Sequence, residues 1–285
     1  MSASGVEPPG RRRIWLCADD YGISGSVNAA IRDLAARGRL NAVSALVAAP
    51  SFGRAEAAAL GVLNSAAPRL AIGLHLALTA PFRPMSDGYA PVRGGAFLPL
   101  AATFCHAVTR RLRSDALAAE VARQIDAFGD AFGRAPDFID GHQHVHLFPQ
   151  ITNVLLAVMK ERVPDAWVRQ CGRALPFAER FDDRKGLFLD LLSWRFRRRA
   201  AAHGLRTNPA FAGTYDFRET ADFADLFPRF LNGLPEGGVV MCHPGFVDDE
   251  LRRLDPLTTL REKEYTYFAA DSFPAVLASR GIALV

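Results

Sequence analysis

Cysteine and long apolar runs are both scarce in this sequence of 285 residues. The four cysteines are far apart and form no C-x-x-C pair, which argues against a zinc ribbon and against a disulfide framework. Cys17 and Cys242 stand in apolar runs and are predicted to be small core residues. No uncharged stretch of about 18 apolar residues is present, so no membrane span is expected. The apolar run after Arg11–Arg13 stops at Ala18, too short for a signal peptide, and we expect a cytoplasmic protein.

A strong net charge is also absent. The chain has 34 Lys and Arg against 30 Asp and Glu, and its basic residues are scattered or lie in helix-like stretches such as Arg195–Arg199. This distribution does not indicate a nucleic-acid partner. Hydrophobic residues make up 49% of the chain and charged residues 22%, as in ordinary globular proteins. The length permits one large α/β domain or two small ones. We predict one domain over residues 13–285, preceded by a flexible N-terminal tail over residues 1–12.

Short apolar runs alternate with longer helix-like segments along most of the chain. The expected strands are Ile14–Ala18, Ala42–Val47, Leu70–Leu74, Phe138–Asp140, Trp167–Arg169, Val239–Cys242 and Ile282–Val285. The expected helices are Val27–Arg37, Ser114–Phe132, Ile151–Glu161, Arg184–Ala202 and Ala221–Leu231. Such alternation predicts an α/β fold with a parallel sheet, either a doubly wound sheet or a (β/α) barrel, and about seven strands favour the barrel. The segments Thr79–Phe97 and Arg173–Asp182 lack periodicity and are expected to be loops.

Three histidines occur within five residues directly after one expected strand. If Phe138–Asp140 is a strand, its period of two would send His142, His144 and His146 to one side, where several imidazoles could meet a metal ion. The structural alternative is a histidine-rich surface loop, or one core histidine with two solvated neighbours.

Polar residues also end the other expected strands. Asp19 and Asp20 end the first, His75 the third, Asp140 the fourth, Arg169 the fifth and His243 the sixth. Each has an ordinary structural explanation: a helix cap, a satisfied core histidine, an ion pair or a turn residue. Because functional groups of barrels collect at the carboxyl ends of the strands, their shared position favours one common site.

Four ordered motifs span nearly the whole chain and resemble the YdjC-like carbohydrate deacetylases, the ChbG/HpnK family. They are Ala18–Ser24 with Val27 and Asn28, Gly73–Leu76, Phe132–Pro136 leading into Asp140–His146, and Met241–Phe246. The resemblance implies a single distorted (β/α) barrel related to polysaccharide deacetylases. It also implies a metal-dependent hydrolase that removes an acetyl group from an N-acetylated amino sugar. Tyr21 stands where many relatives have Phe.

Carried over by position, the resemblance makes Asp20, His75 and His142 the metal ligands, Asp19 the catalytic base and His243 the candidate acid. Adjacent aspartates cannot point the same way from a strand, which suits this division of roles. One carboxylate and two imidazoles favour Zn²⁺, and Mg²⁺, Mn²⁺ or Co²⁺ also fit such a set.

Four further residues complete the predicted site. Arg169 is expected to restrain Asp19 through a charge-assisted hydrogen bond. His144, His146 and Asp140 are expected to support the ligands or to contact the substrate. His243 is expected to be cationic in the free site, as an acid that protonates the departing amine must be.

Several questions stay open at this point. The alternatives are another metal-dependent amidohydrolase or phosphoesterase, or a non-catalytic sugar-binding protein on the same barrel. The substrate could be a chitooligosaccharide, an N-acetylglucosaminyl glycan or a glycolipid, and a glycolipid would predict an apolar groove near Thr79–Phe104. A homodimer is compatible with the sequence, since symmetric dimers leave no reliable mark in one chain.

Overall fold

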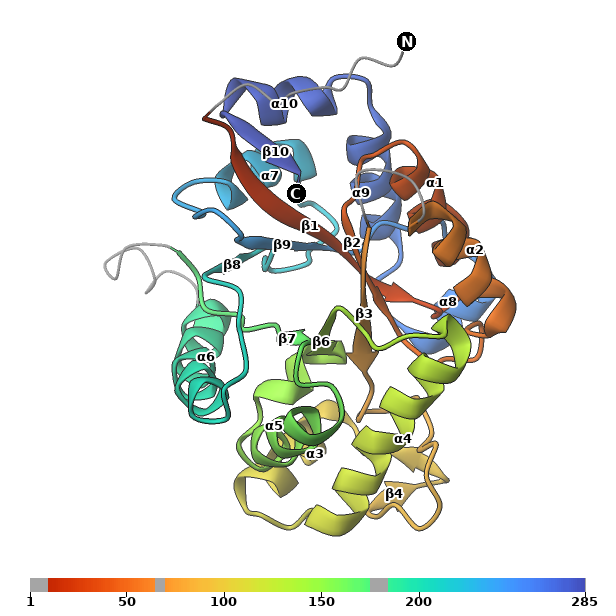
Figure 1. Cartoon of the computed structure of the whole chain (residues 1–285). Coiled ribbons are helices and arrows are strands. Elements are labelled where there is room, and N and C mark those ends of the chain that lie inside the picture. The colour runs from red at the N-terminus through yellow and green to blue at the C-terminus, as the bar shows by residue number, and fades with distance from the viewer. Residues whose placement is uncertain (1–9, 65–69, 175–183, 285) are drawn as a thin grey trace.

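The computed structural model describes residues 10–64, 70–174 and 184–284. Its main sheet has seven parallel strands in the order β7-β6-β3-β2-β1-β9-β8. These strands are β1 (Arg12–Tyr21), β2 (Ala42–Ala45), β3 (Ala71–Leu76), β6 (Phe138–Gly141), β7 (Trp167–Val168), β8 (Phe211–Ala212) and β9 (Val239–Cys242). The sheet is curled and surrounded by helices (Figure 1). The predicted α/β fold with about seven parallel strands is therefore confirmed.

The two ends of the curled sheet meet without forming a regular ladder. Isolated bridges pair Val168 with Thr207 and Arg173 with Phe211. Among the described residues, the barrel is thus closed on this side by single pairings.

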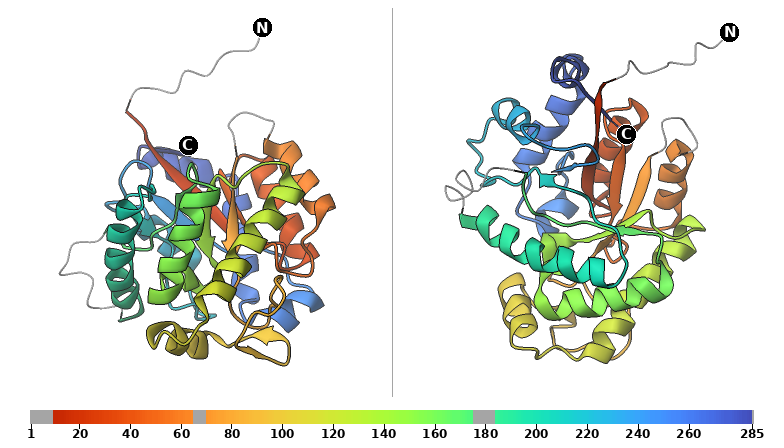
Figure 2. Two further views of the ribbon diagram at one scale, coloured as in Figure 1. Left: turned by 60° about the horizontal axis from the view of Figure 1, so that its bottom comes forward. Right: turned by 60° about the vertical axis from the view of Figure 1, so that its left-hand side comes forward.

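Helices pack around the outside of the sheet (Figure 2). They are α1 (Gly25–Ala36), α2 (Arg54–Asn64), α3 (Leu100–Val108), α4 (Ser114–Phe132), α5 (Pro149–Arg162), α6 (Arg184–Ala202), α7 (Phe223–Phe230), α8 (Asp249–Leu254), α9 (Thr259–Ala269) and α10 (Phe273–Ser279). The bounds of α4 and α6 are the predicted ones, and those of α1, α5 and α7 differ by one or two residues. The helices α2, α3, α8, α9 and α10 are not among the predicted ones.

The chain ends and two connections differ from expectation. β1 already begins at Arg12, which pairs with Ile282, so the expected tail over residues 1–12 is too long at its inner end. Residues 1–9 lie outside the described part of the chain. The last strand, β10 (Ile282–Leu284), pairs with β1 off the main path of the sheet, and the seventh strand of that path is the unpredicted β8. The expected loop Thr79–Phe97 contains a small hairpin of β4 (Val92–Arg93) and β5 (Ala96–Phe97). Of the expected loop Arg173–Asp182, residues 175–182 are outside the described residues.

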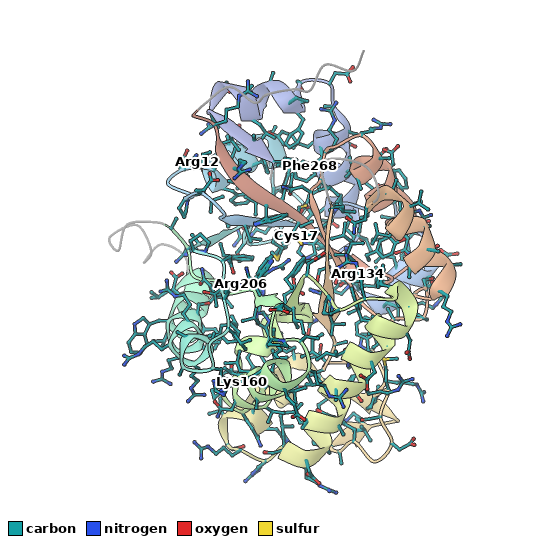
Figure 3. All side chains as sticks on the ribbon, viewed as in Figure 1. Arg12, Cys17, Arg134, Lys160, Arg206 and Phe268 are labelled. Atoms are coloured by element: carbon teal, nitrogen blue, oxygen red, sulfur yellow. The ribbon has the colours of Figure 1, made fainter. Side chains whose placement is uncertain are left out.

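The strands at the centre of the sheet are covered on both faces. Every residue of β2, β3, β6 and β9 is buried, as expected for parallel strands between a barrel interior and a shell of helices. Close packing here requires Gly73, because a Cβ on it would lie 2.4 Å from the Phe138 ring. Cys17 lies near the centre of the molecule (Figure 3), and both Cys17 and Cys242 are core residues as predicted.

Candidate active site

The two adjacent aspartates of β1 are separated by a bulge. The pairing of β1 with β2 shifts register between Ala18 and Tyr21, and Asp20 has a φ of +68°, in the left-handed region. A bulge turns one side chain away from the ordinary alternation of a strand. As a result, Asp19 faces Arg169 whereas Asp20 faces two histidines.

Asp20, His75 and His142 form a buried group with the chemistry of a metal site. Oδ1 of Asp20 lies 3.3 Å from Nε2 of His75 and 2.9 Å from Nδ1 of His142. The three ligand atoms all lie within 4.8 Å of one another. Ligand atoms that share one Zn²⁺ at about 2.1 Å are separated by roughly 3 to 3.5 Å, so the arrangement fits one divalent ion. The three residues that the motifs single out are thus brought together.

His75 is oriented by a second carboxylate. Its Nδ1 donates to Oδ1 of Asp140 at 2.7 Å, and the Ser44 hydroxyl donates to the same oxygen at 2.5 Å. This bond directs Nε2 of the ring toward Asp20. Burial alone would lower the pKa of His75, but the charges of Asp140 and Asp19 raise it to about 10. The carboxylates around His75 therefore favour a positive charge on or beside its ring, as is expected at a cation site.

Asp19 is held by the buried Arg169. Nη1 of Arg169 donates to Oδ2 of Asp19 at 2.6 Å and Nη2 donates to Oδ1 at 2.8 Å. Nη2 also lies 2.6 Å from Oδ2 of Asp140 and 2.9 Å from Sγ of Cys17. The expected charge-assisted bond between Arg169 and Asp19 is present. Cys17, Asp19 and Asp140 form the other potential metal-binding group of the described residues, but the guanidinium already supplies its positive charge.

Arg261, on α9, is a site residue that the sequence did not indicate. It is fully buried, and its Nη2 donates to Oδ2 of Asp20 at 2.6 Å. Its Nε donates to the carbonyl of Leu257 at 2.9 Å, which fixes the direction of the side chain. Burial alone would raise the pKa of Asp20, but Arg261 and then His142 hold it well below its usual range. Asp20 therefore stays ionised.

The prediction that three histidines share one side of a strand is wrong. β6 ends at Gly141, and His142–Leu147 form a 3-10 turn in which Gln143 and His144 have left-handed φ values of 54° and 59°. Each ring consequently points in its own direction. His142 reaches Asp20, and His144 lines the cavity with its Nδ1 3.5 Å from Sγ of Cys171.

His146 lies behind the site instead of in it. The ring is fully buried, and its Nε2 is 2.8 Å from the backbone carbonyl of Arg169. Burial lowers the pKa of His146 to about 4, so the ring is neutral and donates from Nε2 to that carbonyl. His146 thus positions the backbone that carries Arg169.

His243 follows β9 and rests on a buried carboxyl group. Its backbone N–H donates to Glu264 at 2.5 Å, and the Tyr215 hydroxyl donates to the other carboxyl oxygen at 2.8 Å. Burial raises the pKa of Glu264 to about 7 and lowers that of His243 to about 4. Desolvation therefore favours the neutral imidazole in the free site, contrary to the expectation that His243 is cationic there.

The predicted reacting groups line one cavity of about 400 Å³ at the carboxyl ends of the strands. Its lining includes Asp19, Asp20, His75, His142, His144, His243 and Arg261. Leu100 and Phe217 supply apolar lining, and the Phe217 ring lies 5.7 Å from that of His243. A larger cavity of about 720 Å³ lies at the other ends of the strands, between Trp15 and Trp167, and none of the predicted site residues lines it.

Comparison with known proteins places these residues in a family. The family model described as YdjC-like protein matches residues 13–279. A chitooligosaccharide deacetylase of Salmonella schwarzengrund is 29% identical over 274 residues, which cover 95% of this chain and 96% of that protein. The enzyme of the same name from Escherichia fergusonii is 28% identical and covers 91% of this chain and 95% of its own length.

The fold has a close counterpart among solved structures. The crystal structure of a candidate cellobiose-phosphate cleavage protein from Enterococcus faecalis superposes with a TM-score of 0.73 at 22% identity, covering 96% of this chain and 97% of that one. In the described part of this chain, every helix is too short or too polar to cross a membrane.

Proposed function

Because the chain belongs to the YdjC-like family, we propose that it is a metal-dependent hydrolase that removes an acetyl group from an N-acetylated amino sugar. The relatives that it matches over nearly their whole length are named chitooligosaccharide deacetylases. The observation that carries the proposal is the division of labour around one cavity. Asp20 and two histidines converge on one point, while Asp19 beside them is held by an arginine.

One divalent ion is the cofactor of the proposed reaction. Asp20, His75 and His142 would hold it, and a carboxylate with two imidazoles suits Zn²⁺ best, with Mg²⁺, Mn²⁺ and Co²⁺ as further candidates. When bound, such an ion polarises the acetyl carbonyl and makes a nearby water more acidic. The other potential metal-binding group of the described residues contains Asp19 and Asp140, and Arg169 pairs with both of these carboxylates. This favours a one-metal deacetylase over a two-metal phosphoesterase or amidohydrolase.

Asp19 is the general base of the proposed reaction. It takes a proton from the water that attacks the acetyl carbonyl, and Arg169 holds its carboxylate in place through both oxygens. Asp140 pairs with Arg169 and with His75, so it couples the position of the base to that of a metal ligand. His144 lines the cavity and is placed to contact the substrate.

His243 is the candidate acid, with a corrected protonation state. The ring is neutral in the free protein near pH 7, so the proton that Asp19 takes from the attacking water is passed on to His243. The charges of Asp20 and Asp19 oppose the effect of burial on the pKa of His243. His243 then donates the proton to the amine nitrogen as the C–N bond breaks.

A substrate screen tests the proposal. Metal-loaded protein is incubated with acetylated chitooligosaccharides, other N-acetylglucosaminyl glycans and glycolipids, and both acetate and free amine are measured. Equal amounts of acetate and amine are expected from at least one of them. Binding of a sugar without release of either product would instead indicate a sugar-binding protein on the same barrel.

A further inference from the structure

Helix α6 has large apolar side chains on its outer face as well as on its inner one. Phe188, Leu191 and Trp194 are 43%, 54% and 49% exposed, whereas Leu189, Leu192 and Phe196 of the same helix are buried. The spacing of three residues places the exposed group on one side of the helix. An ordinary surface helix carries polar residues there. The outer face of α6 therefore has apolar side chains that the fold does not cover.

Helix α3 extends this apolar face. The Phe104 ring of α3 contacts the Phe188 ring of α6 edge-on, with 5.5 Å between the ring centroids. Leu100 and Val108 of α3 are also exposed. Five of the eight exposed large hydrophobic residues in the described part of the chain thus lie on these two helices. We call this surface the α3–α6 face and define it by Leu100, Val108, Phe188, Leu191 and Trp194.

Positive charge borders the α3–α6 face. Arg195, Arg197 and Arg198 on α6 and Arg110 and Arg111 after α3 are exposed, and none of these five forms an ion pair within the described residues. The guanidinium of Arg198 lies 5.1 Å from the centre of the Trp194 ring. α3 has no Asp or Glu, and Asp190, which α6 does contain, is buried against Arg173. Neither helix therefore exposes a carboxylate.

We propose that the α3–α6 face docks on the surface of an anionic lipid bilayer. Apolar side chains with arginines around them are the pattern of an interfacial helix, in which Trp and Leu enter the headgroup boundary and Arg contacts phosphate. A second copy of the chain fits the face less well. A two-fold contact through the same patch would bring these arginines toward their own copies.

The position of the face gives docking a consequence for the site. Leu100 belongs both to the α3–α6 face and to the lining of the catalytic cavity. The face therefore reaches the mouth of the site, and docking brings that mouth next to the lipid headgroups. Binding to the bilayer does not depend on the proposed deacetylase activity, and the two can be measured separately.

Vesicle co-sedimentation of the metal-loaded protein tests the proposal. We expect binding to vesicles of phosphatidylcholine with phosphatidylglycerol, weaker binding to phosphatidylcholine alone, and loss of binding at high salt. Leu191→Gln/Trp194→Gln and Arg195→Gln/Arg198→Gln should each weaken binding at least about tenfold. Matched controls are Val62→Gln, which alters an exposed apolar residue of α2, and Arg252→Gln/Arg253→Gln on α8, and both should bind like wild type.

Tryptophan fluorescence gives a second readout. The chain has three tryptophans, and Trp15 and Trp167 line the cavity at the other ends of the strands. Emission should shift to shorter wavelength when anionic vesicles are added, and Trp194→Phe should abolish the shift.

Three results would overturn the docking proposal. They are no binding of wild type to anionic vesicles, wild-type binding by both double variants, or dimerisation of wild type that these variants abolish. Turnover of a water-soluble acetylated chitooligosaccharide should be unchanged in the double variants. A failure of docking is thereby distinguished from a failure of the proposed reaction.

Discussion

Arg261 and Asp20 form a buried ion pair in which Nη2 of the arginine lies 2.6 Å from Oδ2 of the aspartate. The pair occupies one carboxylate oxygen and leaves Oδ1 facing His75 and His142. Arg261 thus sets which oxygen of Asp20 is available to a metal ion. It does so from α9, outside the four motifs.

Replacing Arg261 should therefore weaken metal binding. Arg261→Met removes the ion pair, and Arg261→Lys keeps a charge but loses the bond from Nε to the carbonyl of Leu257. We expect the metal dissociation constant to rise about 10- to 100-fold in the Met variant and less in the Lys variant. Competition with a chelator measures it. Wild-type affinity in both variants would show that Arg261 has only a packing role.

Loss of a ligand should remove the ion itself. His75→Ala or His142→Ala leaves two of the three proposed protein ligands, so most of the single equivalent of bound metal should be lost. Metal analysis of purified protein checks this. His203→Ala is the matched control, because that histidine bonds only the carbonyl of Arg199 at the end of α6. Full metal content in both ligand variants, with the fold intact, would place the site elsewhere.

The two adjacent aspartates should have different phenotypes. Asp19→Asn should keep the metal, since Arg169 retains Asp140 as a partner, but kcat should fall roughly 10²- to 10⁴-fold, the usual scale for a general base. Asp20→Asn should lose metal as well. Metal content and kcat are measured for both. If Asp19→Asn loses the metal while Asp20→Asn stays active, the roles are reversed.

The role of His243 can be separated from its packing by the choice of leaving group. His243→Gln should slow cleavage of an acetamide by about 10²-fold or more, because the departing amine needs a proton. An activated acetyl ester needs none at that step, so its hydrolysis should suffer far less. An equal loss of rate on both substrates would show that the role of His243 is structural. With its pKa near 4, His243 should not set the alkaline limb of kcat/KM in the free protein.

Glu264 should make the protein less stable as the pH rises. Its pKa is raised from 4.5 to about 7 in the folded protein, so the folded state holds a proton that the unfolded state has lost between these values. The folded state is consequently favoured below pH 4.5, and this contribution is lost as the pH rises through 7. It amounts to about 3 kcal/mol, at roughly 1.4 kcal/mol per pH unit.

Glu264→Gln isolates that contribution. Its amide imitates the protonated acid: the oxygen can accept from the backbone of His243, and the NH₂ can donate to Tyr215. Urea denaturation from pH 5 to 8 should show a smaller fall of stability in the variant than in wild type. Parallel curves for the two proteins would mean that Glu264 does not titrate in this range.

Much of the barrel follows from local patterns. The long helices α4 and α6 have their predicted bounds, because apolar residues recur at helical spacing along 19 residues of each. β8 has only two residues, and α9 contains four consecutive charged residues, so neither has an apolar periodicity to detect. The sequence correctly predicted a cluster that includes Asp19, His75, His142 and Arg169, because parallel strands end at one edge of the sheet.

The rest of the site depends on features that no local pattern contains. The left-handed φ values of Gln143 and His144 make the three histidine rings point in different directions. Neither position has a glycine or asparagine, the residues that would have indicated such a turn. From sequence alone, Arg261 is one of several charged residues on a helix that would be expected to face solvent. Only the fold shows that it is buried. The low pKa of His243 is likewise a consequence of burial, which only the folded chain provides.

Acetate release from a chitooligosaccharide tests the deacetylase proposal most directly. Wild type and Asp19→Asn, matched in bound metal, are compared on the same substrate. Wild type should release acetate and amine in equal amounts, and the variant should do so at least about 100-fold more slowly. Equal rates in the two proteins, or no acetate from the metal-loaded wild type on any N-acetylated sugar, would contradict the proposal.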